Sequence, residues 1–275
     1  MHNYKIVATD LDGTLLNNQA DISFENIEAI SAISKKGAYV VPASGRSFSE
    51  MPEKVKNHPD IRYFICSNGA MVYDKKTGNK KVFFIKKTAL KEIFDVLKSY
   101  EVHISVRYGG KLLVESGIQT EENFKYYNLC EPHCVVIRKF SEHVEELEKY
   151  CLANNDTEVV SLFFKNMSEK IKCRELLEKN ENLLVTSVDE YNLEIFDKDA
   201  GKGNALKCLA DMTGVEYHQT ISVGDSDNDM SITVASGLGL ATSNACDSLK
   251  KAADKVICSN EEHVIKYIYE NYFSN

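Results

Sequence analysis

Near its N-terminus the chain reads Lys5-Ile6-Val7-Ala8-Thr9-Asp10-Leu11-Asp12-Gly13-Thr14. The first half of this stretch is short and apolar, which is typical of a buried strand. Acidic residues follow where the strand ends, and Gly13 permits a sharp turn. Because residues two apart in an extended chain point the same way, we expect Asp10 and Asp12 to converge. Two carboxylates so close repel each other unless a cation or a shared proton relieves them.

Strand-like and helix-like segments alternate outward from this stretch. A helix capped by Ser23 precedes a strand at 38–41, and a helical stretch from Ser47 precedes a strand at 63–66. The same alternation of helices and strands is predicted near the C-terminus. Its elements are a helix opened by Lys202 and ended by Gly214, strands at 220–223 and 239–241, a helix after Asp229 and a last helix at 261–272. Such alternation predicts an α/β protein with a doubly wound parallel-sheet core and right-handed crossovers.

The pattern of predicted strands and helices in the middle of the chain indicates a separate α+β domain. The turn Gly109-Gly110 joins two apolar strands, which indicates antiparallel pairing. Beyond it we predict a strand at 135–140, a helix at 142–152, a strand at 159–164, a helix at 169–178 and a strand at 183–188. We therefore expect 1–84 and 192–275 to form the core, and 85–191 to form an inserted domain.

Composition bounds the class of protein. The 275 residues are 43% hydrophobic and 27% charged, so a well-buried core is expected. There are 41 acidic and 33 basic side chains, and the net charge of -8 argues against binding to nucleic acid or to anionic membrane. No apolar run approaches the roughly 18 residues of a membrane span. We expect a soluble, cytoplasmic protein that is a monomer or a small homo-oligomer.

Eight cysteines are scattered along the chain without paired spacing, which favours reduced thiols over a disulfide framework. Cys130, His133 and Cys134 cluster near His143. Their spacing is not a zinc pattern and no second ligand pair follows, so the sequence indicates buried or incidental cysteines there.

Polar residues stand at the ends of the other proposed core strands. Ser44 follows the second strand in Ala43-Ser44-Gly45-Arg46, and Gly224-Asp225-Ser226-Asp227-Asn228-Asp229 follows the strand at 220–223. Ligands of open α/β sheets bind at this edge. An acidic cluster this dense indicates a hard cation such as Mg²⁺. The sequence thus offers two carboxylates, a hydroxyl, the lysine Lys202 and a metal site. This set fits phosphoryl transfer. A calcium loop would need further oxygen ligands, whereas the first motif runs into Leu15-Leu16.

The ordered motifs resemble those of the haloacid dehalogenase (HAD) superfamily, in particular its Cof-like hydrolases, which carry a type IIB α+β cap between the second and third motifs. The matching segments are Asp10-Leu11-Asp12-Gly13-Thr14-Leu15-Leu16, Ala43-Ser44-Gly45-Arg46, Ser67-Asn68-Gly69-Ala70, Lys202-Gly203-Asn204-Ala205-Leu206 and Gly224-Asp225-Ser226-Asp227-Asn228-Asp229. The resemblance implies a Rossmann-like HAD core, with the insert as the substrate-specificity domain.

It also implies a Mg²⁺-dependent phosphatase that hydrolyses a small phosphomonoester, a sugar phosphate or a similar metabolite. Asp10 would attack phosphorus and form an aspartyl-phosphate, while Asp12 would act first as general acid and then as general base. The Asp10 carboxylate, the Asp12 backbone carbonyl and Asp225 would hold the metal, and Asp229 would support them.

By the same resemblance, the phosphoryl oxygens would be bound by Ser44, Lys202, Asn228 and the backbone N–H of Leu11. Ser44 stands where the family usually has threonine, and it keeps the hydroxyl. Asn244 matches a family asparagine, but Ala241-Thr242-Ser243-Asn244 departs from the usual run, so its role stays open.

Two alternatives remain from the sequence. A phosphomutase of the phosphomannomutase type shares the first motif and a similar cap. A receiver domain of a response regulator also combines acidic residues, Ser/Thr, Lys and Mg²⁺ on a doubly wound sheet. Its phosphoacceptor follows an interior strand and it has no large insert, unlike the pattern here.

Overall fold

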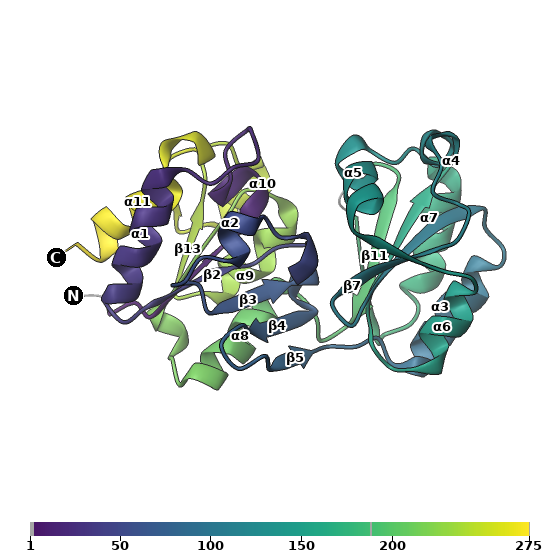
Figure 1. Ribbon diagram of the computed structural model, residues 1–275, viewed down its shortest axis with the longest axis horizontal. Coiled ribbons are helices and arrows are strands. Elements are labelled where there is room, and N and C mark those ends of the chain that lie inside the picture. Colours follow the sequence, from purple (N-terminus) through teal and green to yellow (C-terminus); the bar gives the residue numbers. More distant parts are fainter. Residues whose placement is uncertain (1–2, 188, 275) are drawn as a thin grey trace. The chain divides into compact units, whose positions relative to one another are not determined.

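The structure is a computed structural model that describes residues 3–187 and 189–274. Within these residues the chain divides into two compact units (Figure 1). The first unit, called the core unit here, contains the residues up to Arg46, Met51–Lys81 and the residues from Gly201 on. The second, called the insert unit, contains Ser47–Glu50 and Val82–Ala200. No helix in the described ranges is long and apolar enough to cross a membrane.

A parallel sheet organises the core unit. Its strands are β1 (Ile6–Thr9), β2 (Tyr39–Pro42), β12 (Thr220–Gly224), β13 (Leu238–Ala241) and β14 (Lys255–Val256), in the order β14-β13-β12-β1-β2. Neighbouring strands pair in parallel throughout. Strand β1 therefore lies between the second strand of the chain and a strand that follows it by more than two hundred residues.

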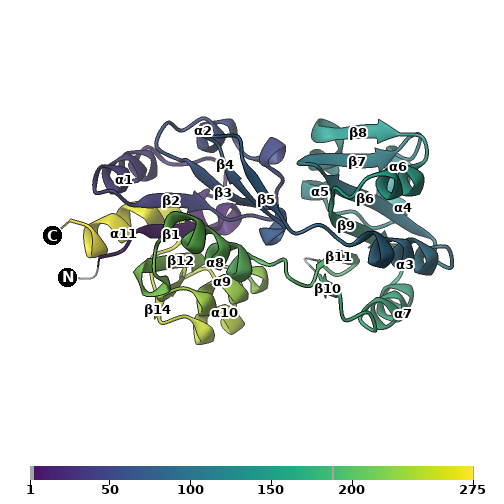
Figure 2. The same cartoon turned by 90° about the horizontal axis from the view of Figure 1, so that it is seen from below.

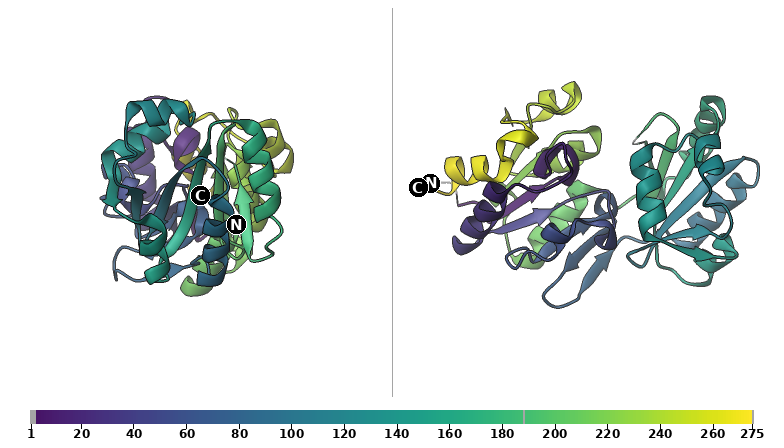
Figure 3. Two further views of the ribbon diagram at one scale, coloured as in Figure 1. Left: turned by 90° about the vertical axis from the view of Figure 1, so that its right-hand side faces the viewer. Right: turned by 45° about the horizontal axis from the view of Figure 1, so that its top comes forward.

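The helices of the core unit are placed by this strand order. They are α1 (Phe24–Lys35), α2 (Glu53–Lys56), α8 (Lys202–Thr213), α9 (Met230–Ala235), α10 (Asp247–Ala252) and α11 (Val264–Tyr272). The crossover from β1 to β2 runs in one direction along the sheet and that from β12 to β13 in the other, so right-handed connections put α1 and α9 on opposite faces. Helix α11 lies beside α1 (Figure 3). The doubly wound α/β prediction is confirmed.

The third predicted strand leaves the parallel sheet. Strand β3 (Tyr63–Cys66) forms a parallel bridge from Ile65 to Ala43, and it pairs antiparallel with β4 (Met71–Asp74). A small sheet β3-β4-β5 results, with β5 at Lys80–Val82. The turn between β3 and β4 thereby stays close to the carboxyl end of β2.

The insert unit is built on a mainly antiparallel sheet in the order β10-β11-β9-β6-β7-β8 (Figure 2). Its elements are α3 (Lys87–Leu97), β6 (Val102–Tyr108), β7 (Lys111–Glu115), α4 (Glu121–Tyr126), α5 (Glu131–Phe140), β8 (Ser141–Val144), α6 (Leu147–Ala153), β9 (Thr157–Phe164), α7 (Met167–Leu177), β10 (Leu183–Thr186) and β11 (Asn192–Asp197). Leu162 packs with α3, α6 and α7, while the next residue, Phe163, packs with α4 and α5. Side chains along β9 thus alternate between the two faces of the sheet, and helices pack on both faces.

Two predictions within the insert are wrong. The segment 135–140, predicted as a strand from its β-branched run, is the end of helix α5. Pro132 sits in the first turn, and Cys134 and Ile137, three residues apart, are both buried. Packing of that helical face against Phe124 and Phe163 outweighs the local preference for a strand. The segment 142–152, predicted as a helix, contains β8 and then α6.

The compact units also correct the predicted boundaries. Strand β11 pairs antiparallel with β9 and β10, so the second sheet runs past residue 192 as far as Asp197. Ser47–Glu50 also belong to the insert unit, where the buried carboxylate of Glu50 pairs with the buried guanidinium of Arg107 at 3.4 Å. The strand predicted at 183–188 ends at Thr186, and Val188 lies outside the described residues.

His103 occupies an apolar site within the insert unit. It is 1% exposed, and its ring contacts those of Phe124, Tyr127 and Phe163 at centroid distances of 6.0, 6.1 and 5.9 Å. Among the described residues, neither ring nitrogen has a hydrogen-bond partner. Burial lowers the pKa of His103 from 6.5 to about 4, because the charged form would lose its hydration.

We predict that His103→Phe makes the protein more resistant to acid. The unfolded chain takes up a proton near the ordinary histidine pKa, whereas the folded chain does so near pH 4, so stability falls between those values. The wild type should lose about 2 kcal/mol more than the variant between pH 7 and pH 5, measured by urea unfolding. His143→Gln, at an exposed position on β8, is the control. Equal losses in wild type and His103→Phe would contradict the assignment.

Candidate active site

The carboxyl ends of three neighbouring strands bring the sequence-predicted residues together. Asp10 follows β1, Asp225 follows β12 and Ser44 lies just beyond β2. The Asp10 N–H donates to the Val223 carbonyl at 2.9 Å, so it continues the ladder into the loop. The strand order reverses between β1 and β12, which makes this edge the switch point where open α/β sheets bind ligands.

Lys202 ties the site together from the first turn of α8. Its buried ammonium donates to Asp10 Oδ1 and to Asp229 Oδ1, each at 2.6 Å. Its position depends on Gly69, whose φ is +92°: a Cβ there would collide with the backbone of Gly201 and Lys202. The turn after β3 and the start of α8 are therefore packed backbone to backbone.

The site holds more negative than positive charge. Single oxygens of Asp10, Asp225 and Asp229 lie within 4.8 Å of one another, and Lys202 is the cation that pairs with two of them. Burial, only partly offset by Lys202, raises the pKa of Asp10 well above its usual range, and Asp229 and Asp225 raise it further. Burial and then Asp229 raise the pKa of Asp225 to about 6. Burial alone would lower the pKa of Lys202, but Asp10 and Asp229 reverse the direction and raise it.

These charges fit a divalent cation. Three carboxylates and one ammonium leave a formal excess of two negative charges in a largely buried site. One Mg²⁺ would neutralise that excess, and carboxylate oxygens are the donors that it prefers. The donor set observed here thus suits the predicted metal, which would also relieve the repulsion that adds to burial in raising the pKa values of Asp10 and Asp225.

Both carboxylate oxygens of Asp229 are hydrogen-bonded to protein groups. Its Oδ1 accepts from Lys202, and its Oδ2 accepts the N–H groups of Asp225 and Ser226 at 3.1 and 3.2 Å. It therefore fixes the loop that carries Asp225 and the lysine that contacts Asp10. This arrangement suits the supporting role expected for Asp229 better than direct contact with a ligand.

The first motif turns instead of continuing as a strand. Leu11–Leu15 form a single wide helical turn, in which Gly13 adopts a φ of +77°. A Cβ on Gly13 would lie 2.6 Å from Asp225 Oδ2, so glycine permits the close approach of the two loops. Thr14 Oγ1 donates to Asp225 Oδ1 at 3.1 Å. Leu11 opens the turn, where a backbone N–H has no acceptor inside the turn.

Asp12 departs from the reasoning based on an extended chain, because the backbone leaves the strand at Leu11. Its side chain is 53% exposed and accepts two bonds from Arg46, from Nε to Oδ2 and from Nη2 to Oδ1, each at 2.8 Å. Arg46 was part of a recognised motif but had no predicted role. The planar guanidinium of Arg46 offers two parallel donors, which match the two oxygens of the Asp12 carboxylate.

The remaining predicted residues lie on loops that are bonded to one another. Ser44 is buried and its Oγ accepts the Arg46 N–H at 3.2 Å. Asn228 Nδ2 donates to Asn68 Oδ1 at 3.2 Å, and the Asn68 N–H donates to the Ser44 carbonyl at 2.9 Å. Asn68, at a positive φ of 50°, is a linking residue that sequence reasoning missed. Its signal was the Ser67-Asn68-Gly69 motif, where asparagine tolerates a left-handed conformation.

Asn244, whose role was open, braces the first motif. Its Nδ2 donates to the Gly13 carbonyl at 2.8 Å and its Oδ1 accepts the Asn260 N–H at 3.1 Å. The Cys246 N–H donates to the Asp225 carbonyl at 2.8 Å from the same loop. The loop after β13 is thus hydrogen-bonded to both acidic loops, the one after β1 and the one after β12.

A family model described as haloacid dehalogenase-like hydrolase matches residues 7–268. The chain belongs to the haloacid dehalogenase-like hydrolases. The resemblance inferred from the motifs is therefore confirmed, and the receiver-module alternative no longer stands.

Its relatives in this family include named phosphatases. The chain is 28% identical to the phosphatase YwpJ of Bacillus subtilis, over 97% of this chain and 99% of the relative. It is 29% identical to the 5-amino-6-(5-phospho-D-ribitylamino)uracil phosphatase YwtE of the same organism, over 98% of both chains. A solved haloacid dehalogenase-like hydrolase from B. subtilis matches with a TM-score of 0.80 and 26% identity, over 98% of this chain and 99% of that one. The expectation of an enzyme, a HAD-type phosphatase, is confirmed.

We predict that Lys202→Met destabilises the metal-free protein by about 3 kcal/mol, because two buried carboxylates lose their shared counter-ion. The loss would be measured by urea unfolding in the presence of a chelator. Lys207→Met, at an exposed position of the same helix, should change stability by less than about 0.5 kcal/mol. A Lys202→Met variant as stable as the control would show that the ammonium does not balance these carboxylates.

Proposed function

We propose that this HAD-family phosphatase is Mg²⁺-dependent and hydrolyses a small phosphomonoester through an aspartyl-phosphate on Asp10. The observation that supports it best is the buried arrangement of Asp10, Asp225 and Asp229 around Lys202, at the switch point of the sheet. A nucleophilic carboxylate, fixed cations and a site for an anion are the parts that phosphoryl transfer needs.

Asp10 is the proposed nucleophile. Lys202 holds Oδ1 at 2.6 Å, so the carboxylate is kept in one orientation, and the ladder bond of its N–H fixes the backbone. In the first step a carboxylate oxygen of Asp10 bonds to phosphorus as the bond to the leaving oxygen breaks. Water then attacks the same phosphorus, releases inorganic phosphate and restores the carboxylate.

Asp12 is the proposed acid and base. Its half-exposed side chain can reach the leaving group or water from solvent, and in this structure it accepts two bonds from Arg46. Asp12 must first separate from Arg46, and its acid form then donates a proton to the leaving oxygen. The carboxylate form then serves to take a proton from the attacking water.

Ser44, Asn228, Lys202 and the Leu11 N–H are the proposed phosphate ligands. Ser44 Oγ already accepts the Arg46 N–H, so its own proton remains to be donated. Mg²⁺ would be held by the Asp10 and Asp225 carboxylates and the Asp12 carbonyl, with Asp229 in support. When bound, the cation would neutralise charge on the phosphoryl group. The prediction that the inserted domain, expected at 85–191 and found as the insert unit, determines substrate specificity is part of this proposal.

The chemistry of the site and the named relatives support a proposal for the substrate class. YwtE is named as a 5-amino-6-(5-phospho-D-ribitylamino)uracil phosphatase, so its substrate carries a phosphate on a ribityl chain. We propose a small metabolite ester of this general kind, a sugar phosphate or a similar compound, for this chain. A phosphomutase would conserve total ester phosphate, so release of inorganic phosphate from a panel of such esters separates the two activities.

We predict that Asp10→Asn abolishes release of inorganic phosphate from p-nitrophenyl phosphate, because the amide is not a nucleophile toward phosphorus. Asp12→Asn should slow turnover by roughly 10²–10⁴-fold, the usual contribution of a positioned acid–base group. Asp211→Asn, at an exposed position of α8, is the control and should keep wild-type rates. Phosphatase activity that survives Asp10→Asn would overturn the mechanism.

We also predict that removal of divalent cations by EDTA abolishes activity, and that excess Mg²⁺ restores it. Independently of activity, Mg²⁺ should raise the melting temperature of the wild type by binding the folded state. Asp225→Asn should lose this thermal shift, whereas Asp247→Asn, at an exposed position on α10, should keep it. A shift retained in Asp225→Asn would place the cation elsewhere.

A further inference from the structure

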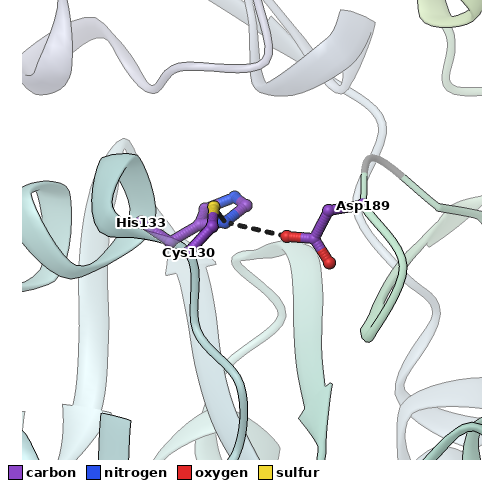
Figure 4. A group of neighbouring side chains, drawn as sticks. All are labelled: Cys130, His133 and Asp189. Carbon is purple, nitrogen blue, oxygen red and sulfur yellow. Dashed lines mark hydrogen bonds and ion pairs between the residues drawn. The ribbon is translucent and has the colours of Figure 1, made fainter. Parts of the chain in front are cut away.

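The insert unit contains a second group of metal-ligand side chains, none of which belongs to the phosphatase motifs. Cys130, His133 and Asp189 each point one donor atom at the others, and the three atoms lie within 4.8 Å of one another (Figure 4). Cys130 Sγ is 3.0 Å from His133 Nδ1, and the same nitrogen is 3.4 Å from Asp189 Oδ2. All three residues are partly buried.

The local backbone explains the convergence. Cys130 is the N-cap residue of α5 and His133 lies three residues later, so both side chains lie on one side of the first turn. The His133 ring rests edge-on against Phe163, with centroids 4.9 Å apart, which fixes its orientation. Asp189 comes from the loop before β11, where its Oδ1 accepts the Tyr191 N–H at 3.0 Å. Its Oδ2 is left to face the histidine.

The geometry does not suit a relay of protons. In a nucleophile–histidine–acid relay, the nucleophile and the acid contact different ring nitrogens. Here sulfur and carboxylate both face Nδ1. Asp189 Oδ2 is buried, and among the described residues it has no hydrogen-bond partner of ordinary geometry, although it is paired with the histidine by charge. Sulfur, imidazole nitrogen and carboxylate oxygen are also the donor types that zinc takes in proteins.

The donor spacing suits a tetrahedral metal ion. With the usual zinc bond lengths, the edges of a tetrahedron between S, N and O donors are about 3.4 to 3.6 Å. The observed nitrogen–oxygen distance of 3.4 Å already matches, and the sulfur–nitrogen distance of 3.0 Å needs a small rotation of the thiol. Thiolate and imidazole favour Zn²⁺ and similar ions over Mg²⁺.

We propose that Cys130, His133 and Asp189 form a site for Zn²⁺ or a similar transition-metal ion, with the fourth position open to water or a ligand. The ion would connect the start of α5 to the loop before β11. His133 and Asp189, which lie in these two segments, are 56 residues apart in the sequence. The sequence did not indicate this site because its third ligand is distant. Cys134, which the sequence grouped with Cys130, is buried and donates instead to the Leu129 carbonyl.

The test is a titration of the full-length protein with Co²⁺, after treatment with a chelator and in excess Mg²⁺ to fill the carboxylate site. We expect one equivalent of Co²⁺ to give a sulfur-to-cobalt charge-transfer band and the strong visible bands of tetrahedral cobalt, both removed by one equivalent of Zn²⁺. Oxygen ligands alone give no such charge-transfer band, so the phosphatase site cannot produce this signal. Absence of the band in the wild type would overturn the proposal.

Variants separate the ligands. Cys130→Ser should remove the charge-transfer band, and Asp189→Asn should keep the band but weaken Co²⁺ binding at least about tenfold, since even residues behind the ligands affect affinity by that much. Cys208→Ser, a half-buried thiol of the core unit, is the matched control and should titrate like the wild type. Zn²⁺ should raise the melting temperature of the wild type and the control but not of Cys130→Ser. A band that survives Cys130→Ser, or unchanged affinity in Asp189→Asn, would contradict the assigned ligands.

Discussion

The ammonium group of Lys202, held between Asp10 and Asp229, is the contact on which the core unit depends. It joins the end of β1 to the start of α8 and to the turn after β12, positions 192 and 27 residues apart in the chain. Removing three charged groups from water is costly, and the cost is recovered only when the partners are close and their other atoms are bonded. The 2.6 Å bonds and the saturated oxygens of Asp229 meet that condition.

This requirement explains why small residues surround the site. Gly13 lets the first loop approach Asp225, and Gly69 lets the turn after β3 meet the backbone of α8. Asn244 supports the first loop from the opposite side by binding the Gly13 carbonyl. Because each loop starts from a strand of one sheet, the functional side chains are held by rigid elements, and little entropy remains to be lost when a ligand binds.

Much of this arrangement was predictable from the sequence, because it depends on local patterns and one topological rule. Strand-end acids such as Asp10 and Asp225 must meet wherever their strands are parallel neighbours. The pair between Asp12 and Arg46 was not predictable, since it depends on where the backbone leaves the strand. In the insert, residues 135–140 look like a strand in isolation and become helix only because of the aromatic side chains that they pack on. Asp189 could not be associated with Cys130 before the sheet order of β11 was known.

The negative charge of the chain bears on how the site could bind its proposed substrate. The chain carries a net charge of -8, yet the proposed substrate is an anion. The carboxylates of the site outnumber its ammonium, so without a cation the site repels a phosphate dianion. A bound divalent ion would neutralise the excess, after which Lys202 and the backbone N–H groups at the strand ends can attract the phosphate. The phosphate affinity of this site should therefore depend on prior binding of the metal, so that an acidic protein is selective for anions at one point on its surface.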